Sequence, residues 1–97
     1  MARIILRSPS LDNLQRQARR AADILARAVA HTGKAVKTTG PLPPPIARIS
    51  GHHRLHFILR SPTAGALHAV LTRARSELFK LKLPVHLAID MDPVNLL

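Results

Sequence analysis

The chain has 97 residues, enough for one modest domain, and its charge is strongly unbalanced. Fifteen Lys and Arg residues stand against five Asp and Glu, giving a formal net charge of +10, and eleven of the fifteen are arginine. The absence of cysteine excludes a disulfide framework and a thiolate metal site. No apolar run approaches the roughly 20 residues of a membrane span. We therefore expect one domain over residues 1–97 that attracts polyanions, against two plainer alternatives: a solubilising surface or a ribosomal-type protein with diffuse charge.

The first third of the chain reads as a strand, a Ser-Pro break and a long helix. The strand lies around residues 3–7, and its apolar run ends at Arg7, too soon for a signal peptide, so we expect a cytoplasmic protein. The helix is predicted from about Leu11 to Ala30, with Gly33 ending it. Its apolar stripe comprises Leu14, Ala18, Ala21, Leu25, Ala28 and Val29. A basic stripe with Arg16, Arg19, Arg20 and Arg27 lies outside it, and we take Arg16 and Arg20 as a second candidate contact for nucleic acid.

A short segment of the chain occurs twice. Residues 5–10 read ILRSPS, and residues 58–63 read ILRSPT. Each copy ends a predicted strand and precedes a predicted helix, so Ser10 and Thr63 are candidate helix caps. Whether this is a duplication or a chance similarity, the two segments are expected to have the same local structure.

The rest of the chain completes a β-α-β-β-α-β order. Residues 36–39 predict a short strand, and the Gly-Pro run of residues 40–45 predicts a stiff extended connection. Arg48 to Arg60 is the longest strand candidate. The second helix is predicted from about Ala64 to Phe79, with an inward face of Leu67, Val70, Leu71, Ala74 and Leu78. The last strand is predicted over Val85–Asp90.

This order predicts an α+β fold of the ferredoxin-like type: a four-stranded antiparallel sheet with both helices on one face. Strand side chains alternate between faces, so Ile4, Leu6, Phe57 and Leu59 are expected beneath the helices. The opposite, open face then collects the candidate nucleic-acid-binding residues Arg3, Arg7, Arg54, His56 and Arg60, together with His86. The arginine guanidinium can donate two hydrogen bonds to one phosphate, so this face is the predicted contact surface for nucleic acid. The alternative is a solvated face on which arginine stems cover Ile5 and Ile58.

Catalytic and metal-binding patterns are weak in this sequence. His52 and His53 precede His56 by only a few residues, but on a strand His53 and His56 point to opposite faces. His52 and His56 share a face at a separation of about 13 Å, too far to chelate one ion. Asp90 and Asp92 read as turn or capping residues, and no phosphate-binding glycine loop is present. We expect no cofactor, no metal and no enzymatic activity of this chain itself.

A spaced set of residues resembles the C-terminal domain of the primosomal replication-restart helicase (primosomal protein N-prime, PriA). It comprises Gly40-Pro41, Arg48-Ile49, Gly51, Arg54, Ile58-Leu59, Ser61-Pro62, Leu67-His68 and Ile89-Asp90-Met91-Asp92-Pro93. The resemblance covers nearly the whole chain. The helicase lobes and their nucleotide-binding motifs are absent, as are the zinc-binding cysteines. The sequence also lacks the aromatic residues that many relatives carry after Gly51.

The resemblance implies an S10-like α+β domain and a set of partners. These are forked or single-stranded DNA, the acidic tail of single-stranded DNA-binding protein, and the rest of the helicase, with no membrane. It also implies a role without catalysis, and we assign His68 and Arg48 as candidate protein-interaction residues. DNA binding is the leading hypothesis. A protein-interaction module is the alternative, and an RNA-binding or ribosomal protein is the third.

Overall fold

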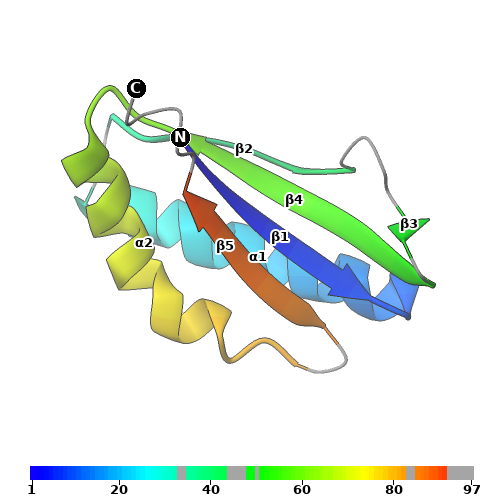
Figure 1. Ribbon diagram of the computed structural model, residues 1–97. Helices are drawn as coiled ribbons and strands as arrows, with labels where there is room; N and C mark the ends of the chain where they lie inside the picture. The colour runs from blue at the N-terminus through cyan, green and yellow to red at the C-terminus, as the bar shows by residue number, and fades with distance from the viewer. Residues whose placement is uncertain (33–34, 44–47, 50, 83–84, 92–97) are drawn as a thin grey trace.

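The computed structural model describes residues 1–32, 35–43, 48–49, 51–82 and 85–91. Five strands and two helices follow in the order β1 (Ala2–Ser8), α1 (Leu11–Thr32), β2 (Lys37–Leu42), β3 (Arg48–Ile49), β4 (His52–Arg60), α2 (Ala64–Leu78) and β5 (His86–Met91). The predicted fold class is confirmed: four principal antiparallel strands lie in the order β2-β4-β1-β5, and both helices cover one face (Figure 1). The two-residue β3 pairs with the start of β4.

The core lies between the sheet and the helices, as the alternation of the strands predicts. Ile4 and Leu6 of β1 and Phe57 and Leu59 of β4 are fully buried on the helical side. Helix α1 contributes its predicted stripe, although Val29 is only half-buried, and α2 contributes all five predicted inward residues. Burial of this apolar surface is the main force that holds the two layers together.

The two ILRSP segments form the same local structure. In the first, the Ser10 amide donates to Ser8 Oγ at 3.1 Å, and the Asn13 amide donates to Ser10 Oγ at 3.2 Å. In the second, the Thr63 amide donates to Ser61 Oγ at 3.2 Å, and the Ala66 amide donates to Thr63 Oγ1 at 3.2 Å. Both predicted caps are therefore confirmed, because each hydroxyl satisfies an amide that the helix start leaves unpaired.

Two buried polar residues of α1 form hydrogen bonds that connect the first half of the helix to other segments of the chain. Asn13 Oδ1 accepts a hydrogen bond from Ser8 Oγ at 3.2 Å. Gln17 Oε1 accepts one from the backbone amide of Lys82, 65 residues away in the chain, at 3.1 Å. Asn13 and Gln17 are buried without lying in the predicted apolar stripe, and these bonds offset the cost of removing them from water.

Three strand boundaries differ from the predictions. The predicted strand from Arg48 to Arg60 is broken at Gly51, whose φ of 79° lies in the left-handed region that glycine adopts readily. Strand β2 continues through Pro41 to Leu42, with an irregular register between Thr39 and Leu42, because an edge strand tolerates a proline and a bulge. Strand β5 begins at His86 and ends at Met91, so each of its ends lies one residue later in the chain than predicted. The predicted helix end at Gly33 lies outside the described residues, and α1 continues to Thr32.

Candidate nucleic-acid interface

The face of the sheet opposite the helices brings basic residues together. Strand β1 lies between β4 and β5, with Arg3 beside Ile58, Ile5 beside His56 and Arg7 beside Arg54. Side chains of paired residues point to the same face. Together with Arg60 and its β2 partner Lys37, this face carries five basic side chains: Arg3, Arg7, Lys37, Arg54 and Arg60. We call it the sheet face; the sequence predicted all of its basic members except Lys37.

The basic side chains gather at two ends of the sheet face. At one end, Arg7 lies between Arg54 on β4 and His86 on β5, and the His86 ring is 6.4 Å from the His52 ring. At the other end, Arg60 pairs with Lys37. Arg54 and Arg60 are six residues apart on one strand, which corresponds to about 20 Å at the usual rise. That length spans roughly six base pairs of a DNA duplex at 3.4 Å per step.

One carboxylate interrupts the positive charge. Asp90 of β5 lies opposite Arg3, and its Oδ2 is 3.6 Å from Arg3 Nη2. Both side chains are partly exposed, so the ion pair contributes little to stability. Its consequence is electrostatic, because Arg3 offers less uncompensated charge to a phosphate than Arg7 or Arg60. The sequence analysis placed Asp90 at the end of the last strand with a turn or capping role; it lies within β5 and pairs with Arg3 instead.

His56 differs from the arginines that surround it. Its side chain is 8% exposed, and Nδ1 has no hydrogen-bond partner among the described residues. Burial, and then the nearby charges of Arg3 and Arg54, lower the pKa of His56 below its usual value. His56 therefore stays neutral at physiological pH and adds no charge to the sheet face.

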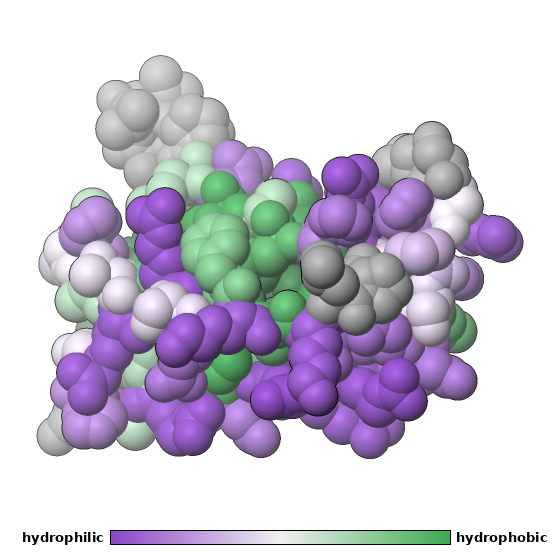
Figure 2. Space-filling model, turned by 90° about the horizontal axis from the view of Figure 1, so that it is seen from below, coloured by the Kyte–Doolittle hydropathy of each residue, from purple (hydrophilic) through white to green (hydrophobic). Residues whose placement is uncertain are grey.

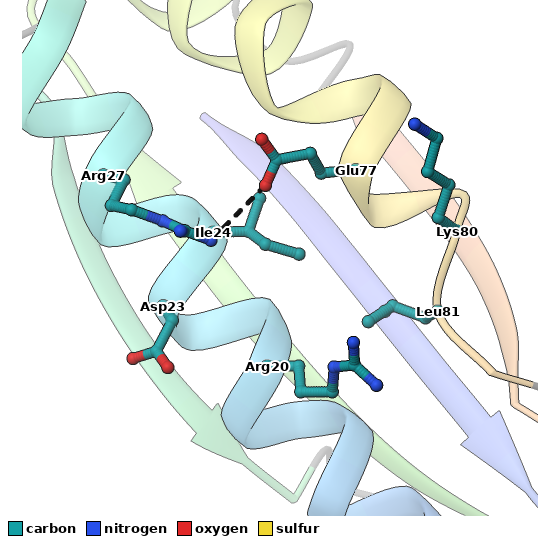
Figure 3. A pocket seen from close by; sticks show the side chains of 7 residues that line it. All are labelled: Arg20, Asp23, Ile24, Arg27, Glu77, Lys80 and Leu81. Atoms are coloured by element: carbon teal, nitrogen blue, oxygen red, sulfur yellow. Dashed lines mark hydrogen bonds and ion pairs between the residues drawn. The ribbon is translucent and has the colours of Figure 1, made fainter.

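The predicted arginines of α1 lie on the helical side of the molecule, away from the sheet face. Arg16 and Arg20 are both exposed on α1. Arg20 lines a hollow between α1 and α2 together with Lys80 and Arg27, whose guanidinium is 3.4 Å from Glu77 Oε2 (Figure 3). The structure thus separates the predicted nucleic-acid residues into two opposite surfaces.

The two predicted protein-interaction residues do not lie together. Arg48 is exposed on β3, at the opposite end of the molecule from α2 (Figure 1). His68 lies on α2 at a groove of about 310 Å³ between α2 and β5. Phe79 and Met91 line this groove and are 55% and 44% exposed, and the Arg75 guanidinium carbon lies 5.6 Å from the centroid of the Phe79 ring. Figure 2 shows an apolar patch bordered by hydrophilic side chains on this side of the molecule.

Two other kinds of site are not found in the described parts of the chain. No group of three or more His, Asp or Glu side chains is arranged there to hold a metal ion. Neither described helix is long and apolar enough to cross a membrane.

The fold and the site together define a small α+β domain with a basic open sheet, and the comparisons with known proteins agree with this class. A solved structure, "De novo designed protein Foldit4", matches with a TM-score of 0.60 at 15% identity, covering 94% of each chain. This likeness shows the fold alone. A search of curated proteins finds no match.

A family model identifies the chain more closely. The model described as "Primosomal protein N C-terminal domain" matches residues 1–94, so the chain belongs to this family. The predicted resemblance is therefore confirmed. Membership associates the chain with the primosome and DNA replication, as a small accessory domain.

Proposed function

We propose that this chain is a non-catalytic DNA-binding accessory domain of a replication-restart helicase, and that its sheet face holds forked or single-stranded DNA. The observation that carries the proposal is the convergence of five basic side chains on one exposed face, against one carboxylate, Asp90, among the residues that the structure describes. Membership of the primosomal family supports DNA as the polyanion. Any ATPase activity would belong to a larger parent chain.

Arg7, Arg54 and Arg60 are the proposed phosphate contacts. Arginine donates two parallel hydrogen bonds to a phosphate, which favours it over lysine for this role. The two phenylalanines of the chain are unsuited to base stacking here, because Phe57 is buried under the sheet and Phe79 lies at the α2–β5 groove. Binding is therefore expected to follow the backbone and to show little preference for base sequence.

The test is a titration of a fluorescently labelled fork at several salt concentrations, with single-stranded and linear duplex DNA in parallel. Binding that weakens steeply as salt rises, and is similar for unrelated sequences, supports the proposal because phosphate contacts release counterions. No binding at low salt would remove DNA as the ligand. Stronger binding to structured RNA than to the fork would favour an RNA-binding role instead.

A second candidate function, docking of an acidic peptide, is favoured by the groove between α2 and β5. Its apolar floor is flanked by Arg75 and His68, so a peptide with acidic residues and an apolar end fits its chemistry. The acidic tail of single-stranded DNA-binding protein and a segment of the helicase core are the partners considered. A labelled acidic peptide should bind the native chain and lose affinity in Phe79→Ala, while fork binding is retained. Equal peptide affinity of both chains would exclude this groove.

A further inference from the structure

A second basic surface lies on the helical side of the molecule, opposite the sheet face. Helices α1 and α2 pack against each other and leave a hollow of about 260 Å³, which adjoins another of about 170 Å³. We call the two hollows together the helix groove. Its walls carry Arg20, Arg27 and His31 from α1, Arg73 and Glu77 from α2, and Lys80 from the turn that follows α2.

The charges of the helix groove are only partly compensated. The ion pair between Arg27 and Glu77 crosses from α1 to α2. Within the described ranges, Arg20 and Lys80 form no ion pair; in Figure 3 the Arg20 guanidinium lies near Leu81, whereas the Lys80 amino group lies on the α2 side and points away from Leu81. Asp23 also lines the hollow, but in this view its carboxylate points away from both cations. The groove therefore carries two cations without an ion pair, Arg20 on the α1 side and Lys80 after the end of α2, in a hollow that Ile24 and Leu81 also line.

Three basic residues of α1, Arg20, Arg27 and His31, line the groove, and Arg16 precedes them on the same side of the helix. Arg16, Arg20, Arg27 and His31 follow one another at intervals of four, seven and four residues, which keeps them on one side of a helix. The line is about 22 Å long at 1.5 Å per residue, close to the length of six base-pair steps. Arg16 and Arg20 carry like charges at a spacing of four residues and repel each other, and a phosphate backbone beside them relieves that repulsion.

The two basic surfaces are far enough apart to act separately. The shortest dimension of the molecule is 17 Å. The Debye length is about 8 Å at physiological ionic strength, so charges bound on opposite faces are largely screened from each other. A phosphate backbone on one face thus leaves the other face available for a second one.

We propose that the helix groove binds the phosphate backbone of a second DNA segment while the sheet face holds the first, so that one domain bridges two arms of a branched DNA. This inference rests on the proposed function of the sheet face. It adds a role for Arg27, Arg73 and Lys80, and it gives a physical reason for a preference for forks, because a linear duplex occupies only one face at a time.

The test measures bridging between two separate duplexes, one labelled with a donor and the other with an acceptor fluorophore, with the full chain at 0.1 M salt. The native chain should give energy transfer and a limiting stoichiometry of two duplexes per chain. Arg20→Gln/Lys80→Gln should shift the midpoint of energy transfer by about 60-fold, because two phosphate contacts are lost. The variant should keep its affinity for a single duplex. Arg20→Lys retains the charge and should still bridge.

A second double variant, Arg7→Gln/Arg60→Gln, separates the failure of this inference from the failure of the proposed function. It removes the same charge from the sheet face and should weaken binding of the first duplex. If it does so while the native chain binds only one duplex, the bridging inference is overturned and the proposed function stands. If only the groove variant weakens binding of a single duplex, both are overturned.

Protein association and peptide binding give two further outcomes. Light scattering of the free chain detects a dimer, which would bridge two duplexes without a second site. Bridging that persists in Arg20→Gln/Lys80→Gln, by a dimer or otherwise, overturns the inference. Loss of acidic-peptide binding in this variant with unchanged bridging assigns the groove to a protein partner and overturns it as well.

Discussion

Replacing Arg7 and Arg60 together with glutamine tests whether the positive charge acts at the sheet face or over the whole surface. Both side chains are exposed, and they lie at opposite ends of the face, on β1 and β4. Neither belongs to the buried core, so the variant is expected to fold normally. The substitution removes two positive charges and two guanidinium groups that can each donate a pair of hydrogen bonds to a phosphate. It keeps polar side chains of similar length.

The expected magnitude follows from counterion release. Each phosphate contact contributes about 0.9 to the slope of log affinity against log salt on duplex DNA, and about 0.7 on a single strand. The loss of two contacts lowers the slope by about 1.8 and 1.4, respectively. At 0.1 M salt this corresponds to about 60-fold weaker binding to a duplex and about 25-fold weaker binding to a single strand.

The assay is fluorescence anisotropy with a labelled fork at four or more salt concentrations. The matched control is Arg19→Gln/Lys82→Gln, which removes the same charge from exposed positions away from the sheet face. The control should leave the slope nearly unchanged. Equal losses of slope in both variants would refute the assignment, since binding would then depend on net charge and not on the sheet face.

Three further predictions concern stability. Thr63→Ala removes the acceptor for the Ala66 amide and should cost about 1 kcal/mol, a fall in Tm of about 4–8 °C by calorimetry, whereas Thr63→Ser should restore most of it. Gly40→Ala should lower the urea midpoint strongly, because φ is 125° and the new Cβ would lie 2.6 Å from the carbonyl oxygen of His56; an unchanged midpoint would contradict this backbone geometry. The pKa of His56 is lower in the folded chain than in the unfolded chain. As pH falls below about 6.5, His56 therefore binds a proton in the unfolded chain at a higher pH than in the folded chain. Stability contributed by neutral His56 is therefore present above that pH and lost on acidification, and His56→Gln should reduce this loss in urea titrations; an unchanged loss in His56→Gln would contradict the prediction.

Much of the fold could be predicted because its signals are local. Alternation along β1 and β4 assigned each side chain to a face, and the apolar spacing of α2 identified its entire buried side. The repeated ILRSP segment gave both helix caps, because a hydroxyl at that position can satisfy the free amides in either copy. The basic residues of the sheet face, apart from Lys37, followed from the same alternation.

The remaining features depend on contacts between distant segments. The pairing of Arg3 with Asp90 requires the register between β1 and β5, and the burial of Gln17 depends on an amide 65 residues away. The helix groove exists only because α1 and α2 pack side by side, which no periodicity within either helix specifies. The break at Gly51 was missed because a single glycine within a strand candidate does not by itself specify the left-handed φ that it adopts here.

The repeated segment also relates strands β1 and β4 by an approximate two-fold symmetry. Residues of the first copy correspond to residues 53 positions later, so Ile4 corresponds to Phe57, and these two residues are paired across β1 and β4. An approximate two-fold axis therefore passes between them, perpendicular to the sheet. This axis exchanges Arg7 with Arg60, each three residues from it. A DNA duplex has local two-fold axes of its own, relating its antiparallel strands, so a duplex laid across this face meets equivalent arginines in either orientation.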